Sequence, residues 1–448
     1  MSSSTTTVLS SDFLEFATPA SSSFWHKSAP ARVRKAYQSG DTEAAWSAWS
    51  SYLAKRKKPE RIDRLFHSKR SPLLWALPEK SNDKNYLASL APRLPSLDTC
   101  LSTLDSSLDA LALAVQLPGL AASLSSDNWW ALLRRLASLS IEAAERPVED
   151  FPLIHQLLAG ELPLTLAYNL PEIAACRQLA GVARRSLEWG LGLLLDGEGL
   201  PQAENLSLLR PLLACWIRCQ ALARRCKDGS LSHDAVAQIE WAVRQSLRWT
   251  RPDGSPVFDA PRAGASCADL FAAALDFDED EDDHAIAALV LPGRVKSRRG
   301  RAGVRALPPV AMLSEWSAAA MLRPDWSHAG PCLSVLYPGR TMLTELSTRR
   351  EFLWSGRWEC EVRLDGTLLV PTGDWEETCW VSDGDVDFLE LQIELTEGVR
   401  IEREMALTRN DGLLLLADAV IGERPGRIEY HGSLPLAPGV SLDGMPET

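Results

Sequence analysis

Hydrophobic residues in the first half of the chain recur at helical spacing. Stripes of this kind predict helices over 31–37, 42–57, 101–115, 128–145, 152–159, 172–195, 206–225 and 232–249. Pro, Gly or Asp-Gly stands at nearly every joint between them, as at Asp196-Gly197 and Asp253-Gly254. Helical hairpins with such short joints are typical of an α/α layered or toroid-like domain.

From about residue 308 the period of the hydrophobic pattern changes to two. The segments that read as strands are 332–336, 341–346, 359–364, 388–395, 400–407, 413–420 and 427–431. In Arg400–Leu407 the early residues alternate between apolar and charged, as a sheet with one wet face requires. The pattern therefore predicts a multidomain α+β protein, with an N-terminal helical α/α toroid-like domain followed by an antiparallel β-sandwich.

Composition divides the chain further. Residues 276–283 contain seven acidic side chains and a basic run follows, which predicts an exposed, charged linker between the two domains. No closing strand is predicted before Thr448, which favours a short or truncated sandwich. The expected parts are a disordered Ser/Thr-rich tail over 1–24, a helical segment over 25–95, the toroid-like domain over 96–270, the linker over 271–306 and the sandwich over 307–448.

Charge and motifs exclude several classes of protein. Lys and Arg number 47 against 59 Asp and Glu, a net charge of −12, which disfavours a nucleic-acid partner. The nine scattered cysteines read as reduced thiols without zinc-ligand spacing, and no nucleotide or hydrolase motif occurs, so we expect no metal and no cofactor. The first residues lack the features of a signal peptide, and no uninterrupted apolar stretch reaches the roughly 20 residues of a membrane span. A cytoplasmic location without a membrane partner is favoured, and the oligomeric state is left open.

Tryptophan is unusually abundant, with 16 Trp against 6 Tyr. Indole rings either fill cores or stack on flat ligands such as sugars. In the predicted sandwich, Trp354, Arg357 and Trp358 stand close to several acidic residues, a combination that holds saccharides. These three residues are predicted to bind substrate, with packing between the sheets as the alternative.

Three passages of the sequence resemble the heparinase II/III-like polysaccharide lyases. The first runs from Ala31 to Trp46 and continues to Tyr52 and Arg56; the second joins 157–163 with 193–199; the third joins 339–370 with 401–418. Together they touch roughly half of the chain. The resemblance implies an α/α toroid with a β-sandwich, and β-elimination acting on an acidic, uronate-containing polysaccharide or oligosaccharide.

The implied reaction needs a group that neutralises the uronate carboxylate, a base for the C5 proton and an acid for the leaving oxygen. His155 and Tyr168 are the candidate base and acid, and Asn205 is the third catalytic candidate. The substrate-binding candidates in the helical half are Asn169, Gln202, Glu204 and Arg210. The alternatives for these residues are structural, because helix ends and caps use the same residue types.

Leu206-Ser207 stands where the family typically has a Tyr-His pair. This departure favours a second function, a catalytically inactive carbohydrate-binding or interaction protein on the same scaffold. A third possibility is a glycoside hydrolase, which needs two carboxylates facing each other across a sugar. Glu204 with Glu161 or Glu198 is the pair that the sequence offers for it.

Overall fold

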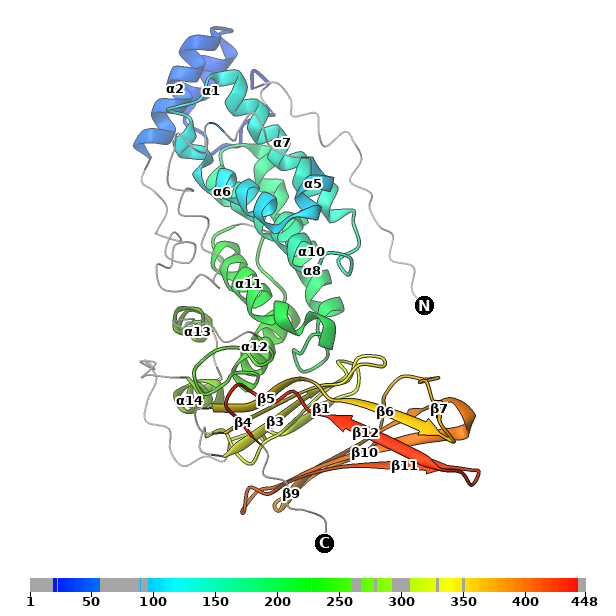
Figure 1. Cartoon of the computed structure of the whole chain (residues 1–448). Helices are drawn as coiled ribbons and strands as arrows, with labels where there is room; N and C mark the ends of the chain where they lie inside the picture. The colour runs from blue at the N-terminus through cyan, green and yellow to red at the C-terminus, as the bar shows by residue number, and fades with distance from the viewer. Residues whose placement is uncertain are drawn as a thin grey trace. The chain divides into compact units, whose positions relative to one another are not determined.

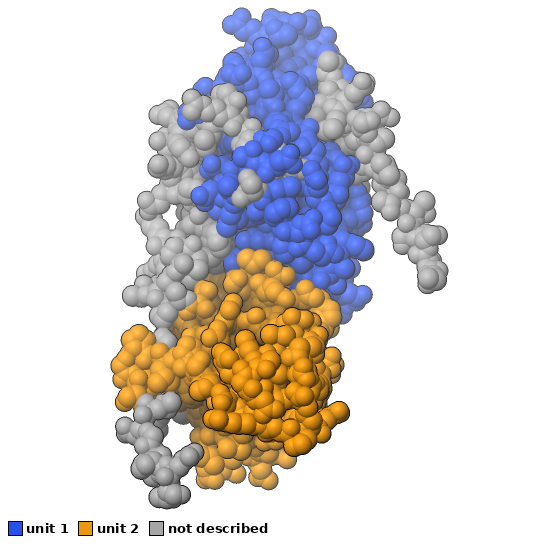
Figure 2. Space-filling model, turned by 45° about the vertical axis from the view of Figure 1, so that its right-hand side comes forward, with its two compact units in different colours: residues 1–194, 211–239 blue, residues 195–210, 240–448 orange. Residues whose placement is uncertain are grey.

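Two compact units make up the computed structural model of the chain (Figure 2). Unit 1 comprises residues 1–194 and 211–239, and unit 2 comprises residues 195–210 and 240–448. The residues that the structure describes are 19–56, 89, 96–259, 267–291, 307–348 and 351–441, except 22, 227, 278, 279, 328 and 329. Most of the predicted tail and about half of the predicted N-terminal helical segment lie outside them.

Unit 1 is helical, as the 3.6-residue pattern predicts (Figure 1). Side-chain caps begin several of its helices: Asp41 accepts hydrogen bonds from the backbone N–H of Glu43 and Ala44, and Ser125 accepts one from Asn128. Its elements are α1 (Ala31–Gln38), α2 (Thr42–Lys55), α5 (Leu97–Ser102), α6 (Leu104–Leu120), α7 (Ser126–Ala144), α8 (Pro152–His155), the π-helix η5 (Gln156–Glu161), α9 (Leu162–Asn169) and α10 (Ala174–Leu194), with most of α11 (Leu209–Ala223) and the start of α12 (His233–Arg248).

Tryptophan rings form the core at the N-terminal end of unit 1. Trp129 and Trp130 pack edge to face with ring centroids 4.6 Å apart, and Trp25 meets Trp49 in the same way at 5.0 Å. All four rings are buried. Much of the tryptophan surplus therefore serves packing between helices, since each large ring buries a wide apolar surface.

Unit 2 begins with helices, which include part of the segment predicted as a linker. These are the 3₁₀-helix η6 (Ala203–Leu208), the end of α12, α13 (Ala268–Leu275) and α14 (Glu281–Val290). Asp283 is buried, because Arg244 neutralises it through an Nε–Oδ1 contact of 2.6 Å and also binds Asp280 at 2.6 Å. The acidic run is thus partly folded instead of solvated throughout; residues 292–306 lie outside the described part.

The rest of unit 2 consists of antiparallel sheets. The first sheet has the order β1-β2-β3-β4-β5, the second β11-β10-β9-β8 and the third β12-β6-β7. The strands are β1 (Met312–Ser314), β2 (Ala319–Leu322), β3 (Pro331–Leu336), β4 (Leu343–Thr348), β5 (Glu351–Arg357), β6 (Glu359–Leu364), β7 (Thr367–Leu368), β8 (Glu376–Ser382), β9 (Val386–Glu394), β10 (Val399–Thr408), β11 (Leu414–Gly422) and β12 (Ile428–Ser433). Every pairing among these strands is antiparallel, as predicted.

The core of the sandwich follows from period-two alternation. In β9 and β10 every second residue is buried, including Leu389, Leu391, Ile401 and Met405. These side chains meet apolar residues of the other two sheets in one cluster. Figure 1 shows β6 and β12 crossing over β10 and β11, so two layers enclose this core.

The described part of the chain has one helical stretch with the length and hydropathy of a membrane span, Ala203–Ala223, with a mean hydropathy of 1.2. Of its apolar window, 78% is buried inside the fold, as expected for a core helix of a folded domain. The chain is therefore a multidomain α+β protein in which a helical N-terminal part is followed by antiparallel sheets, in agreement with the sequence pattern.

Candidate functional site

The catalytic candidates of unit 1 lie inside its helical packing. His155, at the end of α8, is 3% exposed, and its Nδ1 lies 3.2 Å from the amide Nε2 of Gln156. Burial lowers the pKa of His155, which favours the neutral form of the ring. The Tyr168 hydroxyl oxygen is also buried. Among the described residues of unit 1, both reactive groups are therefore buried.

Asn169 joins two helices. Its Nδ2 donates to the backbone oxygens of Ala114 at 3.0 Å and Val115 at 3.3 Å, near the end of α6. Those carbonyls stand one turn before Pro118, which cannot supply an N–H to the helix. The amide therefore satisfies helix carbonyls and is committed to packing.

Glu161 is paired within unit 1 and does not present a free carboxylate. Arg218 donates to both of its oxygens, at 2.6 Å and 2.8 Å, and both side chains are buried. Cys215 and Cys219 place their sulfur atoms within 4.8 Å of a Glu161 oxygen, a grouping with metal-ligand atom types. Burial raises the pKa of both thiols, however, and the carboxylate already holds a cation, so this cluster reads as a packed ion pair with neutral thiols.

The polar loop after α10 is tightly folded within unit 2. The Oδ1 atom of Asp196 accepts from the backbone N–H of Glu198 at 2.8 Å and Leu200 at 2.9 Å, which forms the predicted Asp-Gly turn. Its Oδ2 atom accepts from Ser314 Oγ at 2.7 Å, and Ala203 N–H donates to Ser317 O at 2.9 Å. The loop is thereby fastened to the turn between β1 and β2.

This fastening leaves the predicted polar residues at the surface. Gln202 and Glu204 are exposed and Asn205 is half-buried. Arg210, predicted with them, turns inward: it donates to Gly254 O at 3.0 Å and Thr250 Oγ1 at 2.7 Å. Burial lowers its pKa. The residues predicted as one polar cluster are therefore separated: Gln202, Glu204 and Asn205 lie at the surface, and Arg210 lies in the core.

The antiparallel order brings three segments of the first sheet to one end. Because β1 to β5 are neighbours that alternate in direction, the β1–β2 turn, the β3–β4 loop and the last residue of β5 share that end. They carry Trp316, which is 45% exposed, Arg340, whose side chain is 58% exposed, and the exposed Arg357. Because neighbouring strands lie about 4.8 Å apart, the row from Trp316 to Arg357 extends over roughly 15–20 Å across the sheet.

We call this surface the loop-end site. Its members are Gln202, Glu204, Asn205, Trp316, Arg340 and Arg357. Four of the six were predicted from the sequence, and tertiary structure brings them together across about 150 residues of chain. Trp316 and Arg340 were missed, although a tryptophan in a short polar turn between two strands was a usable signal.

The two ends of the loop-end site differ in the groups that they present, because arginines stand at one end among carboxylates. Near Trp316, the Tyr337 hydroxyl is buried, and burial together with Glu377 and Glu315 raises its pKa. Burial and the neighbouring Glu315 raise the pKa of Glu377. The other end carries Arg357, whose guanidinium has no hydrogen bond or ion pair among the described residues, Arg340, whose Nε lies 4.0 Å from Asp374 Oδ1, and the exposed Glu359. Carboxylates at both ends suit sugar hydroxyls, and the arginines at the second end suit sugar acids.

The two predicted tryptophans of the sandwich lie below the surface. Trp354 is buried, and its Nε1 donates to Thr344 Oγ1 at 3.1 Å across the β4–β5 pair. Trp358 follows β5 and is 8% exposed. Trp354 contributes to the core between the sheets, while Trp358 lines the cavity described next.

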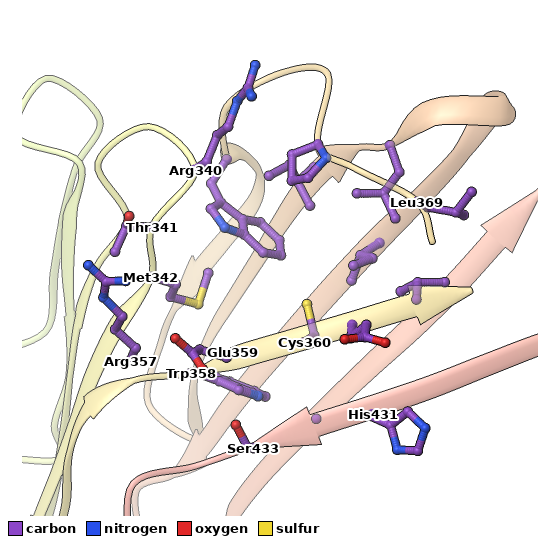
Figure 3. A pocket seen from close by; sticks show the side chains of 18 residues that line it. Arg340, Thr341, Met342, Arg357, Trp358, Glu359, Cys360, Leu369, His431 and Ser433 are labelled. Atoms are coloured by element: carbon purple, nitrogen blue, oxygen red, sulfur yellow. The ribbon is translucent and has the colours of Figure 1, made fainter. Parts of the chain in front are cut away.

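A cavity of about 490 Å³ opens beside Arg340 and Arg357 (Figure 3). Figure 3 shows the Cys360 sulfur directed into it and Arg340 and Arg357 at its rim. Its lining is Arg340, Thr341, Met342, Arg357, Trp358, Glu359, Cys360, Glu361, Val362, Leu369, Pro371, Trp375, Ile393, Leu395, Ile401, His431, Gly432 and Ser433. Its size falls in the range of small-molecule sites.

Comparison with known proteins identifies the fold. The sequence matches no protein-family model and no curated protein. Among solved structures it is similar to the heparinase III BT4657 gene product, with 12% identity, a TM-score of 0.60 and coverage of 89% of this chain and 77% of that one. It is likewise similar to the heparan sulfate lyase HepC from Pedobacter heparinus, with 14% identity, a TM-score of 0.53 and the same coverage. A further heparinase III structure matches with 12% identity, a TM-score of 0.52 and coverage of 89% and 62%.

This chain has the fold of the heparinase III-type lyases. At 12–14% identity the likeness concerns the scaffold: a helical toroid-like part followed by a β-sandwich. This chain spans 63% of the length of the BT4657 gene product in the structure with methylated lysines. The scaffold resemblance inferred from the three sequence passages is thus supported by structure.

Proposed function

We propose that this protein binds an acidic, uronate-containing saccharide along the loop-end site. The observation that carries the proposal is the shared end of the first sheet, where Trp316, Arg340 and Arg357 stand in a row beside the loop of Gln202 and Glu204. The lyase-type scaffold supports a saccharide as the ligand.

Each group in the row has a chemical counterpart in such a ligand. The exposed Trp316 ring offers a flat apolar face for a sugar ring. Gln202, Glu204 and Asn205 offer amide and carboxylate atoms to the sugar hydroxyls. The planar guanidinium groups of Arg340 and Arg357 pair with uronate carboxylates, because their N–H groups match the two oxygens.

β-Elimination is the second candidate function, favoured by the likeness to heparan sulfate lyase folds. It requires a base and an acid that reach the substrate. His155 and Tyr168, the candidates for these roles, have buried reactive atoms in unit 1, and Leu206-Ser207 replaces the Tyr-His pair of the family. We therefore propose saccharide binding as the leading function and β-elimination as the second.

Calorimetric titration with heparan-type and alginate-type oligosaccharides tests binding. Arg357→Gln should weaken binding at least about tenfold, since a lost charge-assisted hydrogen bond costs about 1.5–3 kcal/mol. Trp316→Ala should weaken binding by a similar factor, because it removes the apolar ring face that covers the sugar. The matched controls are Trp189→Ala, a 64% exposed tryptophan of unit 1, and Arg424→Gln, a 54% exposed arginine before β12. Equal losses in the controls, or no binding by the unmodified protein, would overturn the proposal.

Absorbance of the unsaturated uronate product tests elimination on the same oligosaccharides at several pH values. Binding without product supports the leading proposal. Robust turnover that is lost in both His155→Ala and Tyr168→Phe would establish the lyase function at those residues. Turnover that survives both substitutions would place the chemistry on other residues.

A further inference from the structure

The sandwich cavity and the arginine end of the loop-end site are continuous. Trp358 N–H donates to Met342 O at 3.1 Å, and Leu343 is the strand partner of Arg357. The segments that carry Arg340 and Arg357 therefore run side by side at the mouth of the cavity (Figure 3). A ligand held by the two arginines lies directly at this opening.

The inside of the cavity has a different chemistry from its mouth. The charged and hydroxyl-bearing lining residues are exposed or half-buried: Arg340, Thr341, Arg357, Glu359, Glu361, His431 and Ser433. The buried part of the lining consists of residues of the sandwich core such as Trp358, Val362, Trp375, Ile393 and Ile401. The aliphatic side chains among them offer no hydrogen-bond partners to sugar hydroxyls, and each indole offers a single N–H donor. Most hydroxyls of a buried sugar ring would therefore lack partners, which is costly. An apolar group suits this interior and a sugar ring does not.

An internal ion pair packs against the two indole walls of the cavity. The Arg403 guanidinium lies 3.8 Å from the Trp358 ring centroid and 5.0 Å from that of Trp375. Its Nη1 donates to Trp358 O at 3.1 Å, and Asp418 binds its Nε and Nη2 at 2.6 Å and 2.7 Å. The two indole walls are thereby fixed in place before any ligand arrives, which lowers the ordering cost of binding.

We propose that the saccharide carries an apolar substituent, an acyl chain or an aryl group, which enters the sandwich cavity while Arg340 and Arg357 hold a neighbouring carboxylate. This inference rests on the proposed saccharide-binding function and specifies its ligand class. The substituent provides the apolar surface that the walls bury, and the acidic sugar remains at the polar mouth.

Calorimetric titration of the full chain with four simple glycosides tests the inference. The probes are methyl, phenyl and octyl β-D-glucuronide and octyl β-D-glucoside, each below its micelle concentration. Each buried methylene tightens binding about fourfold, so octyl glucuronide should bind at least about a hundredfold tighter than methyl glucuronide. The affinities of phenyl and octyl glucuronide, compared with each other, show whether the cavity prefers an aryl group or the alkyl chain of an acyl group.

The outcomes separate this inference from the proposed function. Equal affinity for the methyl and octyl glucuronides, with acidic oligosaccharides still bound, would overturn the inference and leave the proposed function standing. Octyl glucoside binding as tightly as octyl glucuronide would overturn the pairing of the cavity with the two arginines. Octyl glucuronide binding without any affinity for acidic oligosaccharides would instead overturn the proposed function.

A cavity-filling variant locates the substituent. Cys360→Phe places a ring where the half-buried thiol faces the cavity, so the affinity ratio of octyl to methyl glucuronide should fall at least about tenfold. Cys379→Phe is the matched control, because Cys379 is a half-buried thiol of β8 outside the cavity lining, and it should keep the ratio. An unchanged affinity ratio of octyl to methyl glucuronide in Cys360→Phe would overturn the placement of the substituent in the cavity. If that variant does not fold, the comparison of glycosides on the unmodified protein still tests the inference.

Discussion

The guanidinium of Arg403 stacks on the ring of Trp358 at 3.8 Å while Asp418 neutralises it through two contacts of 2.6 Å and 2.7 Å. Tyr430 donates its hydroxyl to the same Asp418. A cation, an aromatic wall and a carboxylate are thus joined inside the sandwich. Their mutual dependence leads to the first prediction.

Removing one partner of this ion pair should strongly destabilise unit 2. Arg403→Met leaves the Asp418 carboxylate buried without its cation, which typically costs about 3–5 kcal/mol. The double variant Arg403→Met/Asp418→Leu should recover most of that loss, because no unpaired charge remains. Urea denaturation measures the free energy of unfolding; a single variant within about 1 kcal/mol of the parent would show that water reaches the carboxylate.

Two tryptophans of unit 2 should respond in opposite ways to truncation. Trp354→Ala removes a buried ring that is bonded to Thr344 and should lower the free energy of unfolding by about 3–5 kcal/mol. Trp316→Ala removes a ring that is 45% exposed and should change stability by less than about 1 kcal/mol. Thermal and urea unfolding measure both variants. A large loss of unfolding free energy in Trp316→Ala would show that the Trp316 ring belongs to the core.

The turn that carries the polar loop depends on one glycine. Gly199 has a φ of +80°, and a Cβ atom there would lie 2.5 Å from the backbone nitrogen of Ala242. Gly199→Ala should therefore cost at least about 2 kcal/mol, from both the left-handed backbone and the clash. Gly197→Ala is the matched control in the same turn, since nothing lies within 4 Å of a Cβ at that position. Similar losses in both variants, measured by urea unfolding, would contradict this account.

Acid should destabilise unit 1 partly through His155. Burial lowers its folded-state pKa below the ordinary value of 6.5, so the folded protein disfavours the proton that the unfolded chain accepts. The stabilisation is complete above pH 6.5 and is lost as pH falls toward the folded pKa, by up to about 1.4 kcal/mol per pH unit. His155→Gln should flatten this slope in unfolding experiments between about pH 5 and 7.5. An identical slope in parent and variant would show that other groups carry the acid sensitivity.

The fold was largely predictable where local periodicity and tertiary environment agree. β9 and β10 alternate cleanly between buried and half-buried residues, and both were predicted within two residues of their ends. β5 and β8 were missed, as were the short strands β1, β2 and β7. In β5 and β8 the apolar residues form short runs, 352–354 and 379–381, between charged and small residues, without a period of two. The α14 helix was missed because its acidic first turn resembles a solvated linker until Arg244 is seen to neutralise Asp283.

The candidate site was only partly predictable. Gln202, Glu204 and Arg357 were predicted as binding residues and Asn205 as a catalytic residue, and the structure places all four at one end of unit 2. His155 and Arg210 were predicted alongside them but are buried in hydrogen-bonded positions. A polar residue on a helix looks the same in sequence whether its partner is a ligand or a neighbouring backbone oxygen.

The sequence by itself determined the order of structures: amphipathic helices, then strands of period two, because hydrophobic spacing along the chain dictates which local geometry can bury one face. Only the tertiary structure decided which polar groups remain available. Asp196 binds Ser314 across 118 positions of sequence and so brings the loop of Gln202 to the turn of Trp316. Antiparallel pairing then places Arg340 and Arg357 in the same row. Such placements depend on contacts between distant segments, which form only when the burial of apolar surface repays the entropy of ordering the chain.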